Sequence, residues 1–316
     1  MDRTPSQSET LKVSSADWLL VAIPGIIWGA SFLFIAEGLR SVAPGGVTFI
    51  RIFVGFITLT LFPAARQPVG RSAWPGTALL GVLWFALPLS MFPWAEQHVS
   101  SAITGMLNAV TPIFVALVAT AVARKAPAQR VLFGLVTGVI GSVLVALPML
   151  KEGSNSGLGV VLILIASMSY GFALNFARPL QQRYGALPVI WRALGVAVVL
   201  TAPLGLRDVA AANWTTAALL CLLALGALGT GIAFVLLAVA TGRVGATRAS
   251  AAAFLMPPVS LVLGILVRGE HVGLLSIFGS AVCVAGAWMI RPRPSPPPRP
   301  QRAPLVPCVE TVSARN

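Results

Sequence analysis

A small number of side chains in this 316-residue chain are polar, aromatic or helix-breaking and yet lie within long apolar stretches. They are Trp28, Ser31, Arg51, Asn108, Thr111, Pro112, Tyr170, Asn175, Arg192 and Pro257. A polar group is costly to bury in an apolar environment, so it is expected to face a protein interior or a water-filled cavity. These residues are therefore the candidates to line a substrate cavity.

The uncharged candidates differ in which other hydrogen-bond partners or surroundings could accommodate them. The Asn108 amide has more hydrogen-bonding groups than its own helix can satisfy, which favours a cavity role. The hydroxyls of Ser31 and Thr111 could instead bond to a carbonyl one turn earlier or join neighbouring helices. Trp28 and Tyr170 lie near the centres of their apolar runs, where each could face a cavity, pack against protein or face lipid.

Two prolines are expected to break their helices. Pro112 and Pro257 each remove a backbone donor within an apolar run, and the resulting kink frees carbonyls of the preceding turn. Paired kinks at corresponding places are typical of broken helices around a central binding site, although a purely structural kink stays an alternative.

Two arginines lie inside predicted helices. Arg51 is about six residues and Arg192 about four residues into its run, hence about 9 Å and about 6 Å deep. Each guanidinium could reach back to the lipid headgroups. Alternatively, each could be a fixed positive charge near one mouth of a cavity, where it would attract a substrate carboxylate.

Residues suited to catalysis, metal binding or proton exchange are scarce. Glu37, Glu96, His98, Glu270 and His271 all cluster near the ends of apolar runs, and the three cysteines form no paired motif. No phosphate-binding Gly-rich loop is present. We therefore predict no enzyme activity, no catalytic residue, no metal site and no cofactor.

The composition indicates an integral membrane protein. Hydrophobic residues make up 57% of the chain and charged residues 10%, against about 25% charged in a soluble domain. The net charge of +13 would suggest nucleic-acid binding in a soluble protein. Here the basic residues lie between apolar runs and in the C-terminal tail, so no nucleic-acid partner is expected.

Ten apolar runs are long enough, at about 20 residues per span, to cross a lipid bilayer. They are Trp18–Glu37, Gly45–Phe62, Trp74–Trp94, Ser101–Ala123, Val131–Leu150, Gly157–Ala177, Pro188–Leu206, Trp214–Ala240, Ala246–Val267 and Val272–Ile290. They lack the alternation of barrel strands, so the fold class is all-α. The sequence predicts ten transmembrane helices.

The distribution of Lys and Arg predicts the orientation. Sixteen of these residues fall on the side that holds both termini, whereas only Arg40, Lys151, Arg207 and Arg268 fall on the other. Since cytoplasmic loops carry the excess of Lys and Arg, both termini are expected in the cytoplasm and the chain in the cell (plasma or inner) membrane.

The chain also matches itself at an offset of 145, which places Pro112 on Pro257, Phe133 on Phe278 and Gly134 on Gly279. Five helices are an odd number, so two such repeats have inverted topology, as in many secondary transporters. The predicted organisation is a cytoplasmic N-terminal segment (1–17), two five-helix repeats (18–150 and 157–290) and a disordered cytoplasmic tail rich in Pro and Arg (291–316).

Several segments resemble a known family. WGASFLFIAEGL and VTFIRIFVG are similar to the first two helices of EamA-type carriers of the drug/metabolite transporter (DMT) superfamily. NAVTPIFVALVA and FLMPPVSLVLGILVRGEHV resemble that family's fourth and ninth helices, and FGLVTGVIGSVLVA and IFGSAVCVAGAWMI its closing helices. One departure is Arg124-Lys125 in the first half, where the second half has Gly269-Glu270.

This resemblance implies two five-helix halves around a central cavity and alternating-access export of small metabolites, often amino acids. The expected partners are a small-molecule substrate and the lipid bilayer, and a homodimer is compatible with the sequence. A membrane channel and a membrane-embedded enzyme are the alternatives, but the chain has neither rings of charge nor converging catalytic groups.

Overall fold

The computed structural model describes residues 15–124, 127–147, 157–268 and 273–290. Within these ranges the backbone is helical with short connections and contains no strand, which confirms the predicted all-α class. Of the predicted N-terminal segment only Ser15–Asp17 is described. The predicted tail 291–316 and the pair Glu270-His271 lie outside the described residues.

Seven helical stretches of the described chain are long and apolar enough to cross a membrane. They are Leu19–Gly38 (α1), Arg71–Ala95, Ile103–Ala123, Gly157–Tyr184 (α8), Ala186–Ala210 (α9), Thr216–Val244 and Ala246–Val267. Three shorter apolar helices, α2 (Pro44–Thr60), α7 (Gln129–Ala146) and α14 (Leu274–Ile290), coincide with the remaining predicted runs. The molecule is therefore a multi-pass membrane protein.

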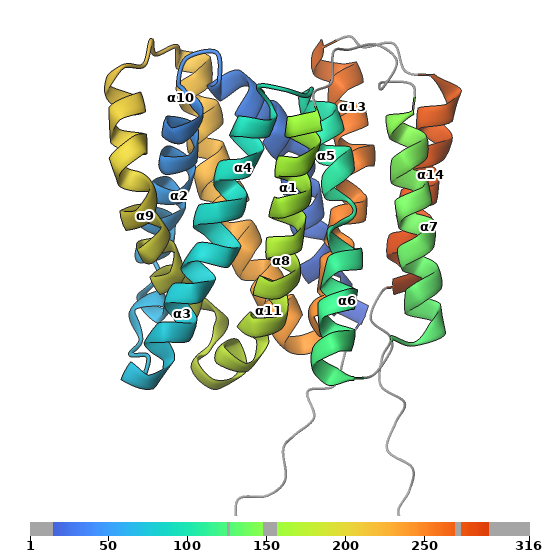
Figure 1. Cartoon of the computed structure of the whole chain (residues 1–316), viewed down its shortest axis with the longest axis horizontal. Helices are drawn as coiled ribbons and strands as arrows, with labels where there is room; N and C mark the ends of the chain where they lie inside the picture. Colours follow the sequence, from blue (N-terminus) through green and yellow to red (C-terminus); the bar gives the residue numbers. More distant parts are fainter. Residues whose placement is uncertain (1–14, 125–126, 148–156, 269–272, 291–316) are drawn as a thin grey trace, which may run out of the picture.

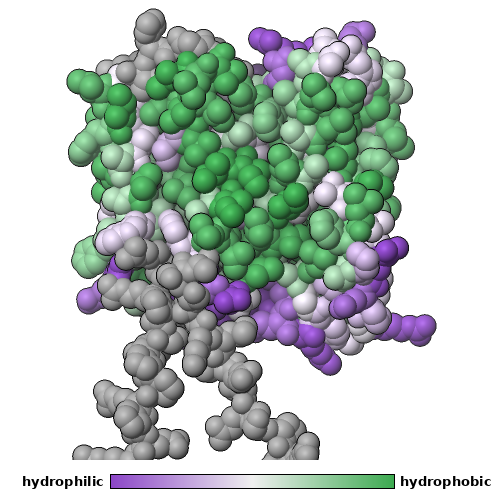
Figure 2. Space-filling view, turned by 180° about the vertical axis from the view of Figure 1, so that it is seen from behind, coloured by the Kyte–Doolittle hydropathy of each residue, from purple (hydrophilic) through white to green (hydrophobic). Residues whose placement is uncertain are grey.

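The helices stand side by side between two ends of the molecule (Figure 1). The helix α1 starts and α14 finishes at one end, here called the basal end, whereas the connection from α1 to α2 and the start of the helix Thr216–Ala224 (α10) lie at the opposite, apical end. Figure 2 shows a broad hydrophobic surface between hydrophilic residues gathered at both ends. The described helices expose large hydrophobic side chains, such as Leu200 and Leu220, which suit contact with lipid tails.

Two of the membrane stretches are interrupted at corresponding places. In the first half of the sequence, α5 (Ser101–Asn108) and α6 (Thr111–Ala123) are separated by a two-residue turn, and Pro112 lies in the first turn of α6. In the second half, α12 (Ala246–Ala249) continues as the 3₁₀ segment η7 (Ser250–Leu255) and then α13 (Met256–Arg268), which carries Pro257 in its first turn. Proline is tolerated there because its missing N–H would have no partner within the helix.

Two π-helical segments interrupt the neighbouring stretches. The segment η4 (Gly81–Ala86) connects α3 (Trp74–Leu80) to α4 (Leu87–Ala95). The segment η6 (Leu225–Ile232) connects α10 (Thr216–Ala224) to α11 (Ala233–Val244). Because such wide turns shift the helix register and occur mostly near functional sites, they indicate where to look for one.

The helices α2 and α9 pack against each other and are joined at both ends. At the apical end the Gly46 N–H, in the first turn of α2, donates to Asp208 Oδ2 of α9 at 3.2 Å. At the basal end Arg192 of α9 donates to the carbonyls of Ala65 (3.4 Å) and Gln67 (2.7 Å), just beyond α2. An anion thus lies at the N-terminus of α2 and a cation near its C-terminus, which complements the helix dipole.

The helices α7 and α14 contact each other through small residues. A Cβ atom added at Gly286 of α14 would lie 2.5 Å from the Gly138 backbone nitrogen of α7, and one added at Gly279 would lie 2.8 Å from the Gly141 carbonyl oxygen. Only glycine allows the two backbones to approach so closely. The Ser142 hydroxyl adds a polar contact of 3.4 Å to the Cys283 sulfur across this interface.

Candidate functional site

A central cavity of about 50 Å³ lies between helices from both halves of the sequence. Its walls are Trp28, Ser31, Phe32, Ile35, Arg51, Trp84, Phe92, Asn108, Thr111, Tyr170, Leu174, Phe234, Leu237, Ser250, Ala252, Ala253 and Met256. At about 10–15 Å³ per water molecule, this volume holds a few waters and no larger solute. A substrate-sized site here would need the surrounding helices to move apart.

Six of the ten predicted residues line this cavity: Trp28, Ser31, Arg51, Asn108, Thr111 and Tyr170. They come from α1, α2, the α5–α6 break and α8, so the tertiary structure brings together residues that are far apart in the sequence. The Ser31 hydroxyl donates to the Ile27 carbonyl at 3.1 Å, the local bond that was the alternative to a cavity role, and yet the residue also faces the cavity.

Arg51 is only 3% exposed, although it carries a full charge. Its Nε–H donates to Thr230 Oγ1 at 3.2 Å, and Thr230 in turn donates to the Leu225 carbonyl at 3.3 Å within the π-helical segment η6. The guanidinium therefore points into the protein and does not extend to the molecular surface. The charge of Glu96 also acts on Arg51.

Asn108 ends α5 and connects three other elements. Its Oδ1 accepts hydrogen bonds from Thr111 Oγ1 (2.9 Å) and Ser167 Oγ (3.4 Å), while its Nδ2 donates to the Met256 sulfur at 3.4 Å. A thioether is a weak acceptor, so part of the amide's donor capacity is left for the cavity that it lines.

Aromatic rings form much of the remaining wall. Phe234 of α11 contacts Trp28, Trp84 and Tyr170, with ring centroids 5.0, 5.9 and 6.4 Å away. Trp28 Nε1 also donates to the Gly229 carbonyl of η6 at 2.7 Å, which satisfies its only polar group. The wall is consequently largely apolar.

The other four predicted residues lie outside the central cavity. Asn175 donates to the carbonyls of Val115 and Gly171, at 3.0 and 2.8 Å, and joins α8 to α6. Arg192 binds the carbonyls beyond α2. Pro112 and Pro257 are buried where α6 and α13 begin, next to the cavity residues Thr111 and Met256.

A second cavity, of about 520 Å³, lies toward the basal end and is here called the vestibule. Its lining includes Thr120 of α6, Asn175 and Arg178 of α8, and Thr247 and Arg248 of α12. The helices α6 and α8 contribute to both cavities, and the vestibule follows the central cavity along them toward the basal end. Solute could approach from that side.

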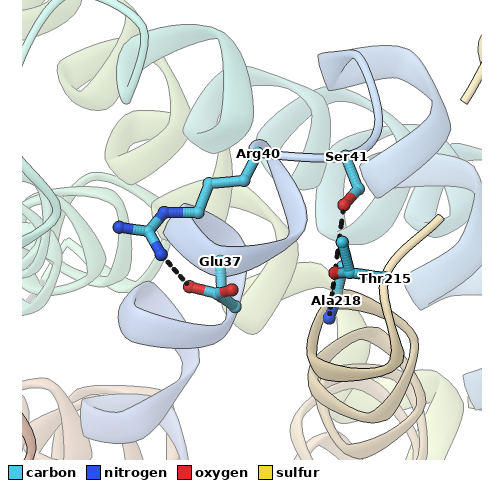
Figure 3. A network of polar contacts seen from close by, with 5 residues as sticks. All are labelled: Glu37, Arg40, Ser41, Thr215 and Ala218. Atoms are coloured by element: carbon cyan, nitrogen blue, oxygen red, sulfur yellow. Dashed lines mark hydrogen bonds and ion pairs between the residues drawn. The ribbon is translucent and has the colours of Figure 1, made fainter. Parts of the chain in front are cut away.

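The apical side of the central cavity is covered. Phe32 lies one turn apical of Trp28, and Phe92 lies two turns apical of Trp84. The rings of Phe32 and Phe92 contact each other edge to face, with centroids 5.8 Å apart. Above them, Ser41 Oγ lies 3.3 Å from Thr215 Oγ1, which also accepts the Ala218 N–H at 3.2 Å (Figure 3). These contacts join the α1–α2 connection to the start of α10.

Sequence reasoning missed several cavity residues, among them Trp84, Phe92, Phe234 and Met256. Apolar side chains inside apolar runs carry no signal that separates a cavity wall from a lipid-facing surface. It also missed Thr230, the partner of Arg51, although the sequence LGALGTGI around it is unusually rich in Gly for a helix interior. No group of three or more possible metal ligands occurs among the described residues.

A multi-pass helical membrane protein with an internal, sparsely polar cavity and a wider vestibule beside it has the architecture of a solute transporter. The sequence profile of the EamA-like transporter family matches residues 17–147 and again residues 157–291. The chain therefore belongs to the EamA-like transporter family.

Relatives with curated names are transporters as well, which points to a transporter and not to an enzyme. The chain is 27% identical to the "Probable terminal-alkyne amino-acid exporter" of Streptantibioticus cattleyicolor, covering 90% of this chain and 95% of that protein. It is 26% identical to the "Uncharacterized transporter YdfC" of Bacillus subtilis, covering 89% and 91% of the two chains. A solved crystal structure shares the fold with a TM-score of 0.70 at 16% identity, covering 87% of this chain and 97% of that one.

Proposed function

We propose that this protein is a secondary transporter that exports small metabolites such as amino acids by alternating access. The observation that carries the proposal is that a buried, sparsely polar cavity has a vestibule on one side and is closed by aromatic rings on the other. A carrier needs such a site, open to one side of the membrane at a time. The relative named "Probable terminal-alkyne amino-acid exporter" supports amino acids as the substrate class.

The proposed architecture is ten transmembrane helices in two inverted repeats, residues 18–150 and 157–290. The paired irregularities support it, because the π-helical segments at Gly81–Ala86 and Leu225–Ile232 occupy corresponding places at the offset of the sequence repeat. The helix interruptions before Pro112 and Pro257 are related by the same offset. Two matching irregularities are expected if both halves derive from one five-helix unit.

The proposed orientation has the basal end and both termini in the cytoplasm of an inner or plasma membrane. Arg66, Arg71, Arg178 and Arg248 all belong to the terminus-bearing side that holds the excess of basic residues, which supports this orientation. A reporter fused after Ile290 should then be cytoplasmic and one inserted at 151–156 external. Two reporters on the same side would contradict the ten-helix topology. A homodimer stays a prediction.

Counterflow in proteoliposomes tests the carrier proposal. Vesicles that contain the purified full chain and an excess of unlabelled amino acid should transiently accumulate the labelled form, with a rate that saturates. A conductance that persists without exchange would instead favour a channel, and a new chemical product would favour a membrane-embedded enzyme. Vesicles without protein provide the background.

A further inference from the structure

The central cavity contains one full charge, Arg51, which has no carboxylate at contact distance within the described chain, although the charge of Glu96 also acts on it. Arg51 lines the cavity while 97% of its surface is covered. In the described chain the ion pairs within 4 Å are Glu37–Arg40 and Asp17–Arg243, so Arg51 has no carboxylate at contact distance there. A buried charge is normally paired, because burial otherwise carries a large desolvation cost.

The Arg51 guanidinium is held in a fixed orientation and still has N–H donors available for a ligand. Nε binds Thr230 Oγ1, and Thr230 is itself fixed by the Leu225 carbonyl. Within the described chain this is the single hydrogen bond of the Arg51 side chain, which has five N–H donors. The planar fork matches a carboxylate, which can accept two parallel hydrogen bonds from it.

The rest of the cavity is suited to an uncharged side chain of the solute. Among the described residues that line it, none is acidic, so an additional positive charge on a solute side chain would meet Arg51 without compensation. Trp28, Tyr170 and Phe234 offer aromatic surface to an apolar group, and a ring face can also attract an ammonium group. The Asn108 amide provides a further polar contact.

We propose that the central cavity recognises its substrate through a carboxylate bound by Arg51 and selects α-amino acids with an uncharged, apolar side chain. This inference rests on the proposed transport function. Amines without a carboxylate and amino acids with a cationic side chain are excluded. Arg51 is always protonated, so it serves as a fixed anchor and does not carry protons.

The test uses L-norvaline, n-butylamine, which is the same molecule without its carboxylate, and L-lysine in counterflow with the full chain in proteoliposomes. L-Norvaline should exchange saturably, whereas n-butylamine and L-lysine should neither exchange nor compete. Arg51→Gln should raise the half-saturation concentration for L-norvaline by about 30-fold or more, since it removes one partner of a buried charge pair. The half-saturation concentration of Arg51→Lys should lie between those of the wild type and Arg51→Gln, because lysine keeps the charge and lacks the planar guanidinium fork.

Arg66→Gln is the matched control, because Arg66 is an exposed arginine at the basal end, away from the cavity lining. It should leave the half-saturation concentration unchanged. If Arg51→Gln fails to insert, Arg51→Lys and Thr230→Val, which frees Nε, provide the same comparison. Wild-type affinity in Arg51→Gln, an equal loss in Arg66→Gln, or competition by n-butylamine would overturn the carboxylate anchor while the carrier function stands. Absence of counterflow with every solute would instead contradict the proposed function.

Discussion

Arg51 and Arg192 have the same side chain and a similar depth inside a predicted helix, yet the structure gives them different surroundings. Arg51 is buried beside the central cavity, where its partner is the Thr230 hydroxyl. Arg192 is half-buried and binds backbone carbonyls, with its guanidinium over the Trp191 ring at 5.3 Å. The difference follows from the neighbouring elements, because η6 covers Arg51 whereas the connection after α2 receives Arg192.

We expect Asn108→Ala to weaken transport without preventing insertion. The substitution removes the amide that accepts from Thr111 and Ser167 and that faces the cavity. The loss of about one net hydrogen bond to the solute should raise the half-saturation concentration about 3- to 10-fold. Counterflow kinetics measure this value.

Asn175→Ala is the control for that substitution. It removes an amide that joins α8 to α6 outside the central cavity. It should therefore lower the melting temperature and have little effect on the half-saturation concentration. Unchanged kinetics in Asn108→Ala would assign Asn108 to helix packing alone.

Arg192→Gln should affect stability and leave substrate affinity unchanged. The substitution removes hydrogen bonds to the carbonyls of Ala65 and Gln67, which hold the basal end of α2 against α9, and one to the Pro188 carbonyl within α9. Since each is a charge-assisted bond in a partly exposed site, we expect a loss of about 1–2 kcal/mol in the free energy of unfolding. Thermal unfolding in detergent measures the loss. A large rise in half-saturation with unchanged stability would contradict this structural role.

At the scale of elements, the irregular helices position the site. The π-helical segment η6 supplies both the Thr230 hydroxyl that orients Arg51 and the Gly229 carbonyl that fixes Trp28. The break between α5 and α6 places Asn108 and Thr111 together at the cavity. Regular helices through η6 and through the α5–α6 break would have turned these side chains and carbonyls away from their present partners, because the register would differ.

The contact between α7 and α14 gives a prediction about glycine. Gly286→Ala places a Cβ 2.5 Å from the Gly138 nitrogen, so the two backbones must separate. We expect a loss of about 1–3 kcal/mol in stability, as is typical for overpacking. Gly242→Ala in α11 is the control, because nothing lies within 4 Å of its added Cβ, and it should be neutral or slightly stabilising. Equal melting temperatures for both variants would contradict the close packing.

At the scale of the whole molecule, alternating access requires the apical contacts to separate during transport. Ser41 and Thr215 lie in different halves of the sequence, with their hydroxyl oxygens 3.3 Å apart. A disulfide between Ser41→Cys and Thr215→Cys, introduced after replacement of Cys221, Cys283 and Cys308, should stop counterflow. Reduction should restore it, because the helices can then part again.

Two controls accompany this cross-link. Each single cysteine variant should transport normally under oxidising conditions, which excludes an effect of the substitutions themselves. Normal transport by the fully cross-linked protein would show that the apical ends need not separate, and so would contradict the proposed cycle.

Much of the fold could be predicted from composition and spacing, and part of the site as well. Apolar runs of about 20 residues between basic connections predict membrane helices, since lipid leaves few other backbone structures. Candidates such as Arg51 and Asn108 were found because polar residues are rare in those runs. Asn175 and Arg192 gave the same signal, although the structure places them outside the cavity.

The sequence by itself determined the class, since hydropathy and charge distribution depend only on which residues occur in which order. It also indicated where the helices bend, through Pro112 and Pro257. Only the tertiary structure decided which side chains share the cavity. That choice depends on helix rotation and on the register shifts of η4 and η6, which bring Trp84, Thr230 and Phe234 toward residues more than a hundred positions away. Residues at such separations leave no local pattern, because their contact is made by packing and not by periodicity.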